Sequence, residues 1–351
     1  MRVLLPINLD RCKFPVATSL RELTIRNPEI DFYSFSSPTS DEDRALGAVL
    51  WSQPHIHKIR VTDLLWQRFD IVHHASATPR NLIAASLAKA RSFGKCVHIF
   101  TAPIQPHDDD EFYRQYITSV HRADVLGAVS HAVATDIQVQ FGRTVDAVIP
   151  SGVDLNFFCP SAAEADLEKL EIRQPYVLFV GVLTPRKRPD VFMEIAALLP
   201  DLDFVMVGSS YTAQEEAKYR ETAAKYPNVK LLGSQPRSQV RNLMGGALAL
   251  VFPSELEGLP LTILEASAMG IPVLAQPKSS MPEAVIEDVT GWLLSVDEPS
   301  LWVEKLQEIA SWSQAQKSSF TLRARNFVTE NYSWDKIARQ YAELYQKLVN
   351  I

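Results

Sequence analysis

Glu257 and Glu265 stand eight positions apart on either side of a Gly-Leu-Pro turn. The apolar run from Leu261 to Met269 predicts a short helix, because Gly270 can supply a left-handed cap and Pro272 cannot continue a helix. Glu257 would then lie in the loop before the helix. Glu265 would lie about one to two turns inside it, at about 1.5 Å rise per residue.

The first turn of this predicted helix is suited to binding an anion such as phosphate, because its amide N–H groups have no partner within the helix. A carboxylate on each side of a phosphate site predicts a ligand with hydroxyl groups on both sides of a diphosphate. A nucleotide sugar is such a ligand. For either glutamate alone, a solvated acid beside a buried helix face is the simpler interpretation, and only the whole string favours ligand binding.

A second group of candidate residues is the run of three cations Arg186, Lys187 and Arg188, which follows a predicted strand ending near Gly181. Open α/β sheets bind ligands outside the carboxyl ends of their strands, so these cations have a place to meet a ligand. Positive charge is useful there, because a departing nucleoside diphosphate gathers negative charge on its β-phosphate. A solvated basic loop is the alternative, and we expect Arg188 to lie outside the site.

The elements that must position these residues alternate between short β-branched strands and helix-like stretches, which predicts parallel sheets covered on both faces. The strands expected in the first half are 3–7, 31–34, 71–73, 96–100, 125–128 and 146–149, with helices at 79–93 and 108–122. Those expected in the second half are 176–180, 204–207, 229–232, 249–252 and 272–275, with helices at 190–199, 214–226 and 238–245.

Turn residues cluster between Ile149 and Pro160, which indicates a junction between two domains. We expect an N-terminal domain over 1–155 and a C-terminal domain over 156–330. The remaining segment, 331–351, is expected to form an amphipathic helix that either crosses back to the first domain or caps the second. Four of the thirteen glycines precede residue 151 and nine follow it, which favours close approach of backbone to ligand in the second domain.

Composition limits the class of protein. The 351 residues are 46% hydrophobic and 22% charged, as in globular domains, and the net charge of −6 argues against nucleic acid as the main partner. The three cysteines are scattered, and no apolar run approaches the roughly 18 residues of a membrane span. We therefore expect a cytoplasmic protein. The basic segment Lys58-Ile59-Arg60 leaves contact with a membrane surface open.

The string from Glu257 to Pro272 resembles the E-x7-E element of retaining glycosyltransferases with the GT-B fold, in the glycogen-synthase-like and family 4 group. The segment from Ile149 to Pro160 also resembles the linker between the two GT-B domains, with Ser151 in place of the usual Asn. The resemblance implies two Rossmann-like, doubly wound parallel-sheet domains facing a cleft. It also implies transfer of a hexose from a UDP- or GDP-sugar to a hydroxyl of a glycan, a lipid-linked acceptor or a small molecule.

The resemblance assigns roles to particular residues. Glu257 would contact the donor sugar and Glu265 the ribose, while Arg186 and Lys187 would bind the diphosphate. The backbone that would hold the diphosphate spans Gly258, Leu259, Pro260, Leu261 and Thr262. Gly233 and Ser234 would meet the base, and Ser254 would lie in the same crevice. No metal or cofactor is expected, because cations already neutralise the diphosphate of the nucleotide sugar.

The acceptor side departs from the family pattern. No glycine precedes Gly47, so Leu9 to Lys13 stand in place of the usual Gly-Gly loop. Thr101 stands where a histidine is usual near the reacting carbon. His73, His74 and His107 remain candidates for the reacting centre.

The sugar, base, acceptor and linkage stay open. The alternatives to a transferase are a catalytically degenerate nucleotide-sugar-binding or regulatory subunit, and a sugar-nucleotide epimerase. A dinucleotide oxidoreductase is disfavoured, because no G-x-G-x-x-G follows either domain's first predicted strand.

Overall fold

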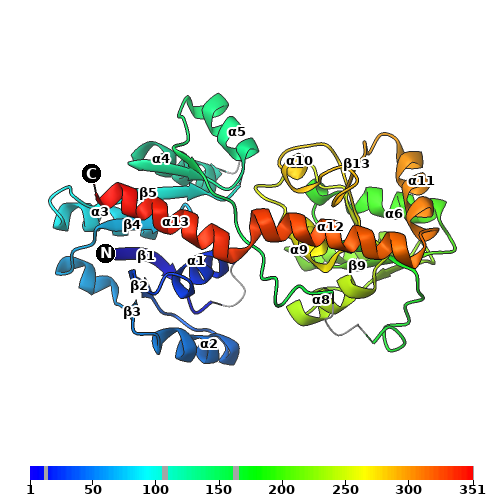
Figure 1. The fold of residues 1–351 in the computed structure, drawn as a ribbon, viewed down its shortest axis with the longest axis horizontal. Coiled ribbons are helices and arrows are strands. Elements are labelled where there is room, and N and C mark those ends of the chain that lie inside the picture. The colour runs from blue at the N-terminus through cyan, green and yellow to red at the C-terminus, as the bar shows by residue number, and fades with distance from the viewer. Residues whose placement is uncertain (12–14, 105–109, 161–165, 351) are drawn as a thin grey trace. The chain divides into compact units, whose positions relative to one another are not determined.

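The computed structural model describes residues 1–11, 15–104, 110–160 and 166–350. The chain divides into two compact units, Met1–Gly152 with Trp334–Ile351 and Val153–Ser333 (Figure 1). The chain therefore passes between the units at Gly152 and again at Ser333, three residues away from each boundary expected from the sequence. The last helix belongs to the first unit.

The first unit contains a seven-stranded parallel sheet in the order β3-β2-β1-β4-β5-β6-β7. The strand order reverses at β1, as in doubly wound sheets. The strands are β1 (Arg2–Asn8), β2 (Asp31–Phe35), β3 (Ile56–Lys58), β4 (Ile71–His74), β5 (Val97–Ala102), β6 (Val125–Ala128) and β7 (Ala147–Val148).

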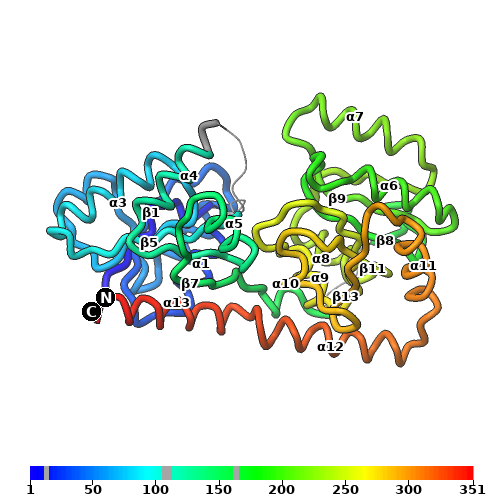
Figure 2. Tube along the Cα trace, turned by 90° about the horizontal axis from the view of Figure 1, so that it is seen from above, coloured from blue at the N-terminus to red at the C-terminus, as the bar shows by residue number. Residues whose placement is uncertain are grey.

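Helices cover both faces of this sheet. They are α1 (Pro15–Ile25), α2 (Asp41–Trp51), α3 (Pro79–Arg91), α4 (Asp110–Arg122), α5 (His131–Phe141), α13 (Trp334–Val349) and the 3-10 helix η1 (Val61–Leu65). The helix α13 lies beside α1 (Figures 1 and 2) and places Ile337, Tyr341 and Tyr345 in the core. The Asn27 side-chain amide donates to the Ala338 carbonyl at 3.2 Å, which fixes this helix to the end of α1.

The second unit repeats the pattern with a six-stranded sheet in the order β10-β9-β8-β11-β12-β13, in which every neighbouring pair is parallel. Its strands are β8 (Tyr176–Val180), β9 (Asp203–Val207), β10 (Val229–Leu231), β11 (Ala249–Phe252), β12 (Val273–Ala275) and β13 (Gly291–Leu293). The order reverses between β8 and β11, so both units have the doubly wound arrangement predicted from the sequence.

Eight helices of the second unit lie within the described residues. They are η2 (Pro185–Lys187), α6 (Pro189–Leu198), α7 (Ala213–Ala223), α8 (Arg237–Gly246), α9 (Leu261–Met269), α10 (Met281–Ala284), α11 (Pro299–Ala310) and α12 (Gln314–Tyr332). The helix α9 has the predicted bounds and ends at Gly270, which has a left-handed φ of 77°. In the part of the chain that the structure describes, we find no helix long and apolar enough to cross a membrane.

Candidate active site

The predicted site residues of the second unit gather at the carboxyl edge of its sheet. All six strands are parallel, so the loops that follow them emerge at the same edge. Lys187 lies in the loop after β8, and Glu257 lies in the loop after β11. These two strands are the neighbours between which the strand order reverses. Ligands of open α/β sheets bind at this kind of switch point.

Glu257 is the centre of a buried ion cluster. Its Oε1 accepts from Lys187 Nζ at 2.5 Å and from Ser254 Oγ at 2.5 Å, and it lies 3.4 Å from Arg186 Nη1. The side chains of Lys187 and Glu257 are only 12% and 10% exposed. The structure therefore joins residues from two sequence motifs about 70 positions apart in one charged cluster.

Burial and charge act in opposite directions on Lys187. Removal from water lowers the pKa of its ammonium group, and the carboxylate of Glu257 opposes this by raising it. The ammonium also lies 4.8 Å from the centre of the Phe252 ring, which supplies a cation–π contact. These contacts hold the Lys187 side chain at the carboxyl edge of the sheet.

The Glu257 loop is held in place by three residues that follow β12. The sequence did not single these residues out as functional. Ser279 Oγ donates to the Glu257 carbonyl at 2.7 Å and accepts from its N–H at 3.0 Å, while Ser280 Oγ donates to the same carbonyl at 2.9 Å. The side-chain amide of Gln276 donates to the Pro253 and Ser254 carbonyls. The available signal was a set of polar residues directly after an apolar strand.

The other two cations of the basic run have different surroundings. Arg186 donates to the Leu256 carbonyl as well as approaching Glu257, so its guanidinium lies against the same loop. Arg188 pairs instead with Asp190 and Glu255. Arg188 therefore has different partners from those of Lys187 and Arg186, and its exclusion from the site stays a prediction.

The predicted phosphate-binding backbone leads directly into α9. Gly258, Leu259 and Pro260 precede the helix, and Leu261 and Thr262 begin it. The Leu261 N–H donates to the Leu259 carbonyl at 2.9 Å, which tightens the turn into the helix. The positive end of the helix dipole is therefore placed beside Glu257, where an anion would be stabilised.

Glu265 lies on α9, with a side chain that is 19% exposed. Its Oε1 lies 3.2 Å from Nη2 of Arg237, the first residue of α8. Burial raises the pKa of Glu265 above its ordinary value, and the charge and hydrogen bond of Arg237 oppose that rise. Sequence reasoning missed Arg237, because nothing in the local pattern connects it with a residue 28 positions away.

Gly233 and Ser234 follow β10 at the same edge. Gly233 has a φ of 71°, and its carbonyl accepts from the Gly208 N–H at 3.0 Å. Ser234 bonds through both its N–H and its hydroxyl to Ser209 Oγ, which follows β9. The residues predicted to meet the base are thus fixed to the neighbouring strand end.

The histidine candidates of the first unit are held inside their own core. His73 Nδ1 lies 2.5 Å from the Tyr345 hydroxyl, and its Nε2 lies 2.9 Å from Thr101 Oγ1. His74 Nε2 lies 2.8 Å from His98 Nε2. Burial first, and His98 second, lower the pKa values of His73 and His74 to about 3, so both are neutral at neutral pH. His107 lies outside the described residues, as does Cys12 of the loop after β1.

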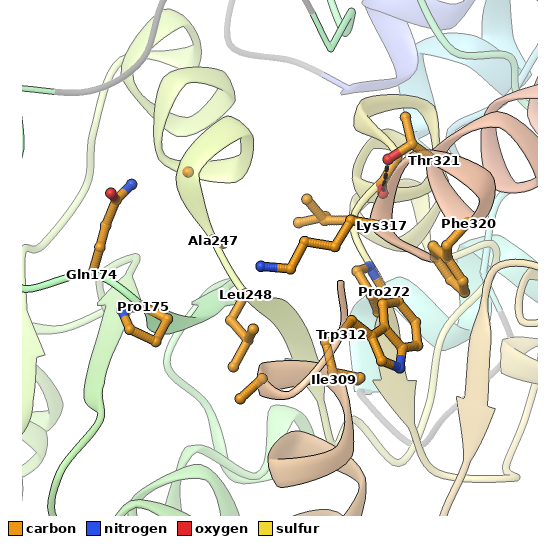
Figure 3. Close-up of a pocket in the computed structure, with 14 residues that line it drawn as sticks. Gln174, Pro175, Ala247, Leu248, Pro272, Ile309, Trp312, Lys317, Phe320 and Thr321 are labelled. Atoms are coloured by element: carbon orange, nitrogen blue, oxygen red, sulfur yellow. Dashed lines mark hydrogen bonds between the residues drawn. The ribbon is translucent and has the colours of Figure 1, made fainter. Parts of the chain in front are cut away.

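Within the described ranges, no group of three or more His, Cys, Asp or Glu side chains is arranged to hold a metal ion. A pocket of about 500 Å³ lies at the other edge of the second sheet, where β11 and β12 begin. Its lining residues include Leu248, Pro272, Ile309, Trp312, Lys317 and Phe320 (Figure 3). None of the predicted site residues contributes to it.

Solved structures with the same arrangement identify the fold. HepE of Anabaena, in complex with UDP and glucose, superposes with a TM-score of 0.76 at 16% identity and covers 98% of this chain and 99% of its own. Sucrose-phosphate synthase of Thermosynechococcus elongatus gives a TM-score of 0.75 at 16% identity, with 99% of both chains covered. The protein therefore has the GT-B fold, as predicted.

Sequence comparison identifies the family of the second unit. Residues 163–327 match the family model described as glycosyl transferases group 1. These residues form a domain of that family, which confirms, for this part of the chain, the resemblance to GT-B glycosyltransferases seen in the sequence.

Two curated relatives have the name D-inositol 3-phosphate glycosyltransferase. The relative from Mycolicibacterium gilvum is 32% identical over 233 residues, which are 64% of this chain and 50% of the relative. The relative from Mycobacterium bovis is 28% identical over 213 residues, covering 58% and 44%. The chain thus spans about half the length of the curated relatives it matches.

Proposed function

We propose that the protein is a retaining glycosyltransferase that moves a hexose from a UDP- or GDP-sugar to the hydroxyl group of a glycan, lipid-linked or small-molecule acceptor. The observation that carries the proposal is the cluster of Glu257, Lys187 and Arg186 beside the first turn of α9. The group 1 domain supports it, and so does the complex of the structural neighbour HepE with UDP-glucose.

The two carboxylate oxygens of Glu257 have different surroundings. All three interactions of its carboxylate go to Oε1. Within the described residues, Oε2 accepts no hydrogen bond, so it is available to a sugar hydroxyl. Lys187 and Arg186 could bind a diphosphate while staying beside Glu257, because each ammonium or guanidinium group has several N–H donors. A nucleotide sugar could therefore place its diphosphate against Lys187 and Arg186 and a sugar hydroxyl against Oε2 of Glu257.

The proposed reaction needs no nucleophile from the protein. The bond from the anomeric carbon to the phosphate oxygen breaks, and the acceptor hydroxyl forms the new bond on the same face. Its proton passes to the departing phosphate oxygen. Negative charge on the leaving diphosphate would be stabilised by Lys187, Arg186 and the positive end of the α9 dipole. Since these groups supply positive charge, we propose that transfer requires neither a metal nor a cofactor.

Two substitutions separate donor binding from transfer. We expect Glu265→Ala to weaken binding of the nucleotide, measured by titration calorimetry, because Glu265 is assigned to the ribose. Glu257→Ala should mainly slow release of nucleoside diphosphate in the presence of acceptors, by about ten- to a hundredfold, because the sugar would be misplaced. The matched control is Glu255→Ala, since Glu255 pairs with Arg188 and Lys278 outside the cluster. Equal and negligible effects of both site substitutions would refute the site assignment.

Thr101 favours a second candidate, a nucleotide-sugar-binding subunit that does not transfer. This residue occupies the place of the usual histidine, and its hydroxyl is engaged with His73 inside the core. Such a protein would bind the donor with neither hydrolysis nor transfer to any acceptor in a broad panel. An epimerase would instead yield an altered nucleotide sugar with no acceptor present.

We further propose a cytoplasmic location with peripheral contact at a membrane surface when the acceptor is lipid-linked. Support comes from the exposed side chains of Lys58 and Arg60 on the first unit. Sedimentation with anionic vesicles should carry the protein down at low salt, and equal recovery with neutral vesicles would refute the contact.

A further inference from the structure

Arg237 contacts both Glu265, the carboxylate proposed to bind the ribose, and a pair of aromatic rings. Its guanidinium carbon lies 5.0 Å from the ring centre of Phe157 and 5.0 Å from that of Phe158. The two rings stand nearly perpendicular to each other, at 79°. Phe158 is completely buried. A guanidinium that contacts both rings is restricted in orientation, because cation–π attraction and packing act on it together.

The restricted guanidinium is aimed at one oxygen of Glu265. Nη2 of Arg237 contacts Oε1, and within the described residues Oε2 accepts no hydrogen bond. The carboxylate group therefore has one oxygen fixed by the protein and one oxygen with unused acceptor capacity. A fixed carboxylate with an available oxygen is the arrangement that a hydroxyl donor requires.

Other charged groups near this site are engaged elsewhere. Arg241, one turn further along α8, lies 4.7 Å from the ring centre of Phe157 and donates to the side chain of its neighbour Asn242. Arg325 of α12 donates to the carbonyls of Leu155, Phe158 and Ala268. The helix α9 carries no other charged residue than Glu265 itself. Arg237 is thus the charged side chain that the structure pairs with this carboxylate.

We propose that Arg237 is a positioning residue for the nucleotide, which holds Glu265 so that its second oxygen accepts a hydrogen bond from the ribose 2′-hydroxyl. The inference rests on the proposed binding of a nucleoside diphosphate sugar and extends it to discrimination between ribose and deoxyribose. A site built to bond a hydroxyl discriminates against an analogue that lacks it, because the site's polar atom is then left without a partner.

The same arrangement predicts a dependence on pH. Since Arg237 opposes the effect of burial, removal of its charge should raise the pKa of Glu265 further. A larger fraction of the carboxyl group would then be protonated as the pH falls, and it would lose acceptor capacity. Nucleotide binding by an Arg237 variant should therefore weaken towards acid sooner than binding by the wild type.

The test compares UDP with 2′-deoxy-UDP, and GDP with 2′-deoxy-GDP, by calorimetry at about pH 7.5 and at about pH 5.5, well above the ordinary pKa of glutamate. For whichever base the wild type binds, it should bind the ribonucleotide more tightly than the deoxynucleotide. Arg237→Gln should lose about two- to fivefold in affinity for the ribonucleotide at the higher pH, as expected for a half-exposed partner. It should lose more at the lower pH, and its affinity for the deoxynucleotide should hardly change.

Arg241→Gln is the matched control, because Arg241 shares the Phe157 contact but does not approach Glu265. It should retain both the ribose preference and the wild-type pH profile. Arg237→Met keeps the apolar stem against the rings and should behave as Arg237→Gln does, even where the glutamine variant folds poorly. Arg237→Lys keeps the charge and should recover part of the ribose preference.

Two results would overturn the inference, and they are distinguishable. If wild type binds neither nucleoside diphosphate, the proposed function fails and the role of Arg237 fails with it. If wild type binds but the Arg237 variants lose equal affinity for the ribo- and deoxynucleotide at both pH values, the proposed function survives. Arg237 would then act only through the packing of α8.

Discussion

At the scale of single residues, the pairing of Lys187 with Glu257 determines both charge and geometry at the proposed site. Both side chains are largely buried, and a buried ion whose partner is removed is costly. We expect Lys187→Met to lower the free energy of unfolding by up to about 3 kcal/mol, with Arg186 and Ser254 limiting the loss. Urea unfolding measures this effect, and the same variant should bind nucleoside diphosphates more weakly.

The double variant Lys187→Met with Glu257→Gln separates stability from function. The neutral amide no longer requires a cation, so most of the lost stability should return, while nucleotide binding should stay weak. An unchanged free energy of unfolding in the single variant would contradict the predicted cost of leaving the Glu257 carboxylate buried without Lys187.

The site residues that the sequence could predict are those within compact motifs. Glu257 and Lys187 could be found because a carboxylate before a helix and cations after a strand have recognisable local patterns. Gln276 and Ser279 left only a weak signal, as polar residues after an apolar strand, and Arg237 left none, because the partners of all three depend on which strand ends become neighbours. That neighbourhood is created by tertiary structure alone.

At the scale of elements, Gly208 allows three loops of the site to approach one another. It follows β9 with a φ of 146°, and a Cβ added there would lie 1.8 Å from the Gly181 carbonyl oxygen. Its own N–H bonds to the Gly233 carbonyl. Any side chain at this position would displace the Gly181 backbone, which leads to Lys187.

We therefore expect Gly208→Ala to weaken nucleotide binding by about tenfold or more, because small displacements in a binding site are costly. Calorimetric titration provides the measurement. Gly142→Ala is the control, since Gly142 also has a left-handed φ, of 64°, but a Cβ there would meet nothing within 4 Å. It should cost about 1 kcal/mol of stability without altering binding. Wild-type affinity in Gly208→Ala would contradict the assignment of these loops to one site.

The elements around the site were largely predictable. The strand β11 and the helix α9 have the predicted bounds, because an apolar run with Gly270 and Pro272 behind it leaves little choice. The short strands β3 and β13 were not predicted, because Ile56–Lys58 and Gly291–Leu293 contain His, Lys, Gly and Trp and lack the β-branched apolar run that marks β12. The helix α12 was not predicted either. It has few buried residues among many polar side chains, so its stability depends on packing against α9.

At the scale of the whole molecule, the two units differ in how they should respond to acid. All eight histidines of the sequence lie between His55 and His131, within the first unit. His73 and His74 have folded pKa values of about 3 against an ordinary 6.5, so the unfolded chain binds more protons between these values. Their contribution to stability is complete above about pH 6.5 and is lost as the pH falls towards 3.

Lowering the pH from about 7.5 to about 5.5 should therefore destabilise the first unit by about 3 kcal/mol, while the second unit serves as an internal control. Amide hydrogen exchange should show lost protection in β4, β5 and α13 but not in β8, β11 and β12. Equal loss in both units would contradict the account of the buried histidines.

The central claim is that the carboxyl edge of the second sheet binds a nucleoside diphosphate sugar. Amide hydrogen exchange tests it most directly, with UDP-, GDP- and ADP-glucose each added at the same large excess, since a specific ligand at about 100 times its Kd adds roughly 2.7 kcal/mol of stability. We predict that one of them protects residues 181–187, 233–234 and 254–265. Protection confined to the pocket around Leu248, Trp312 and Lys317, or no protection with any of the three, would contradict the claim.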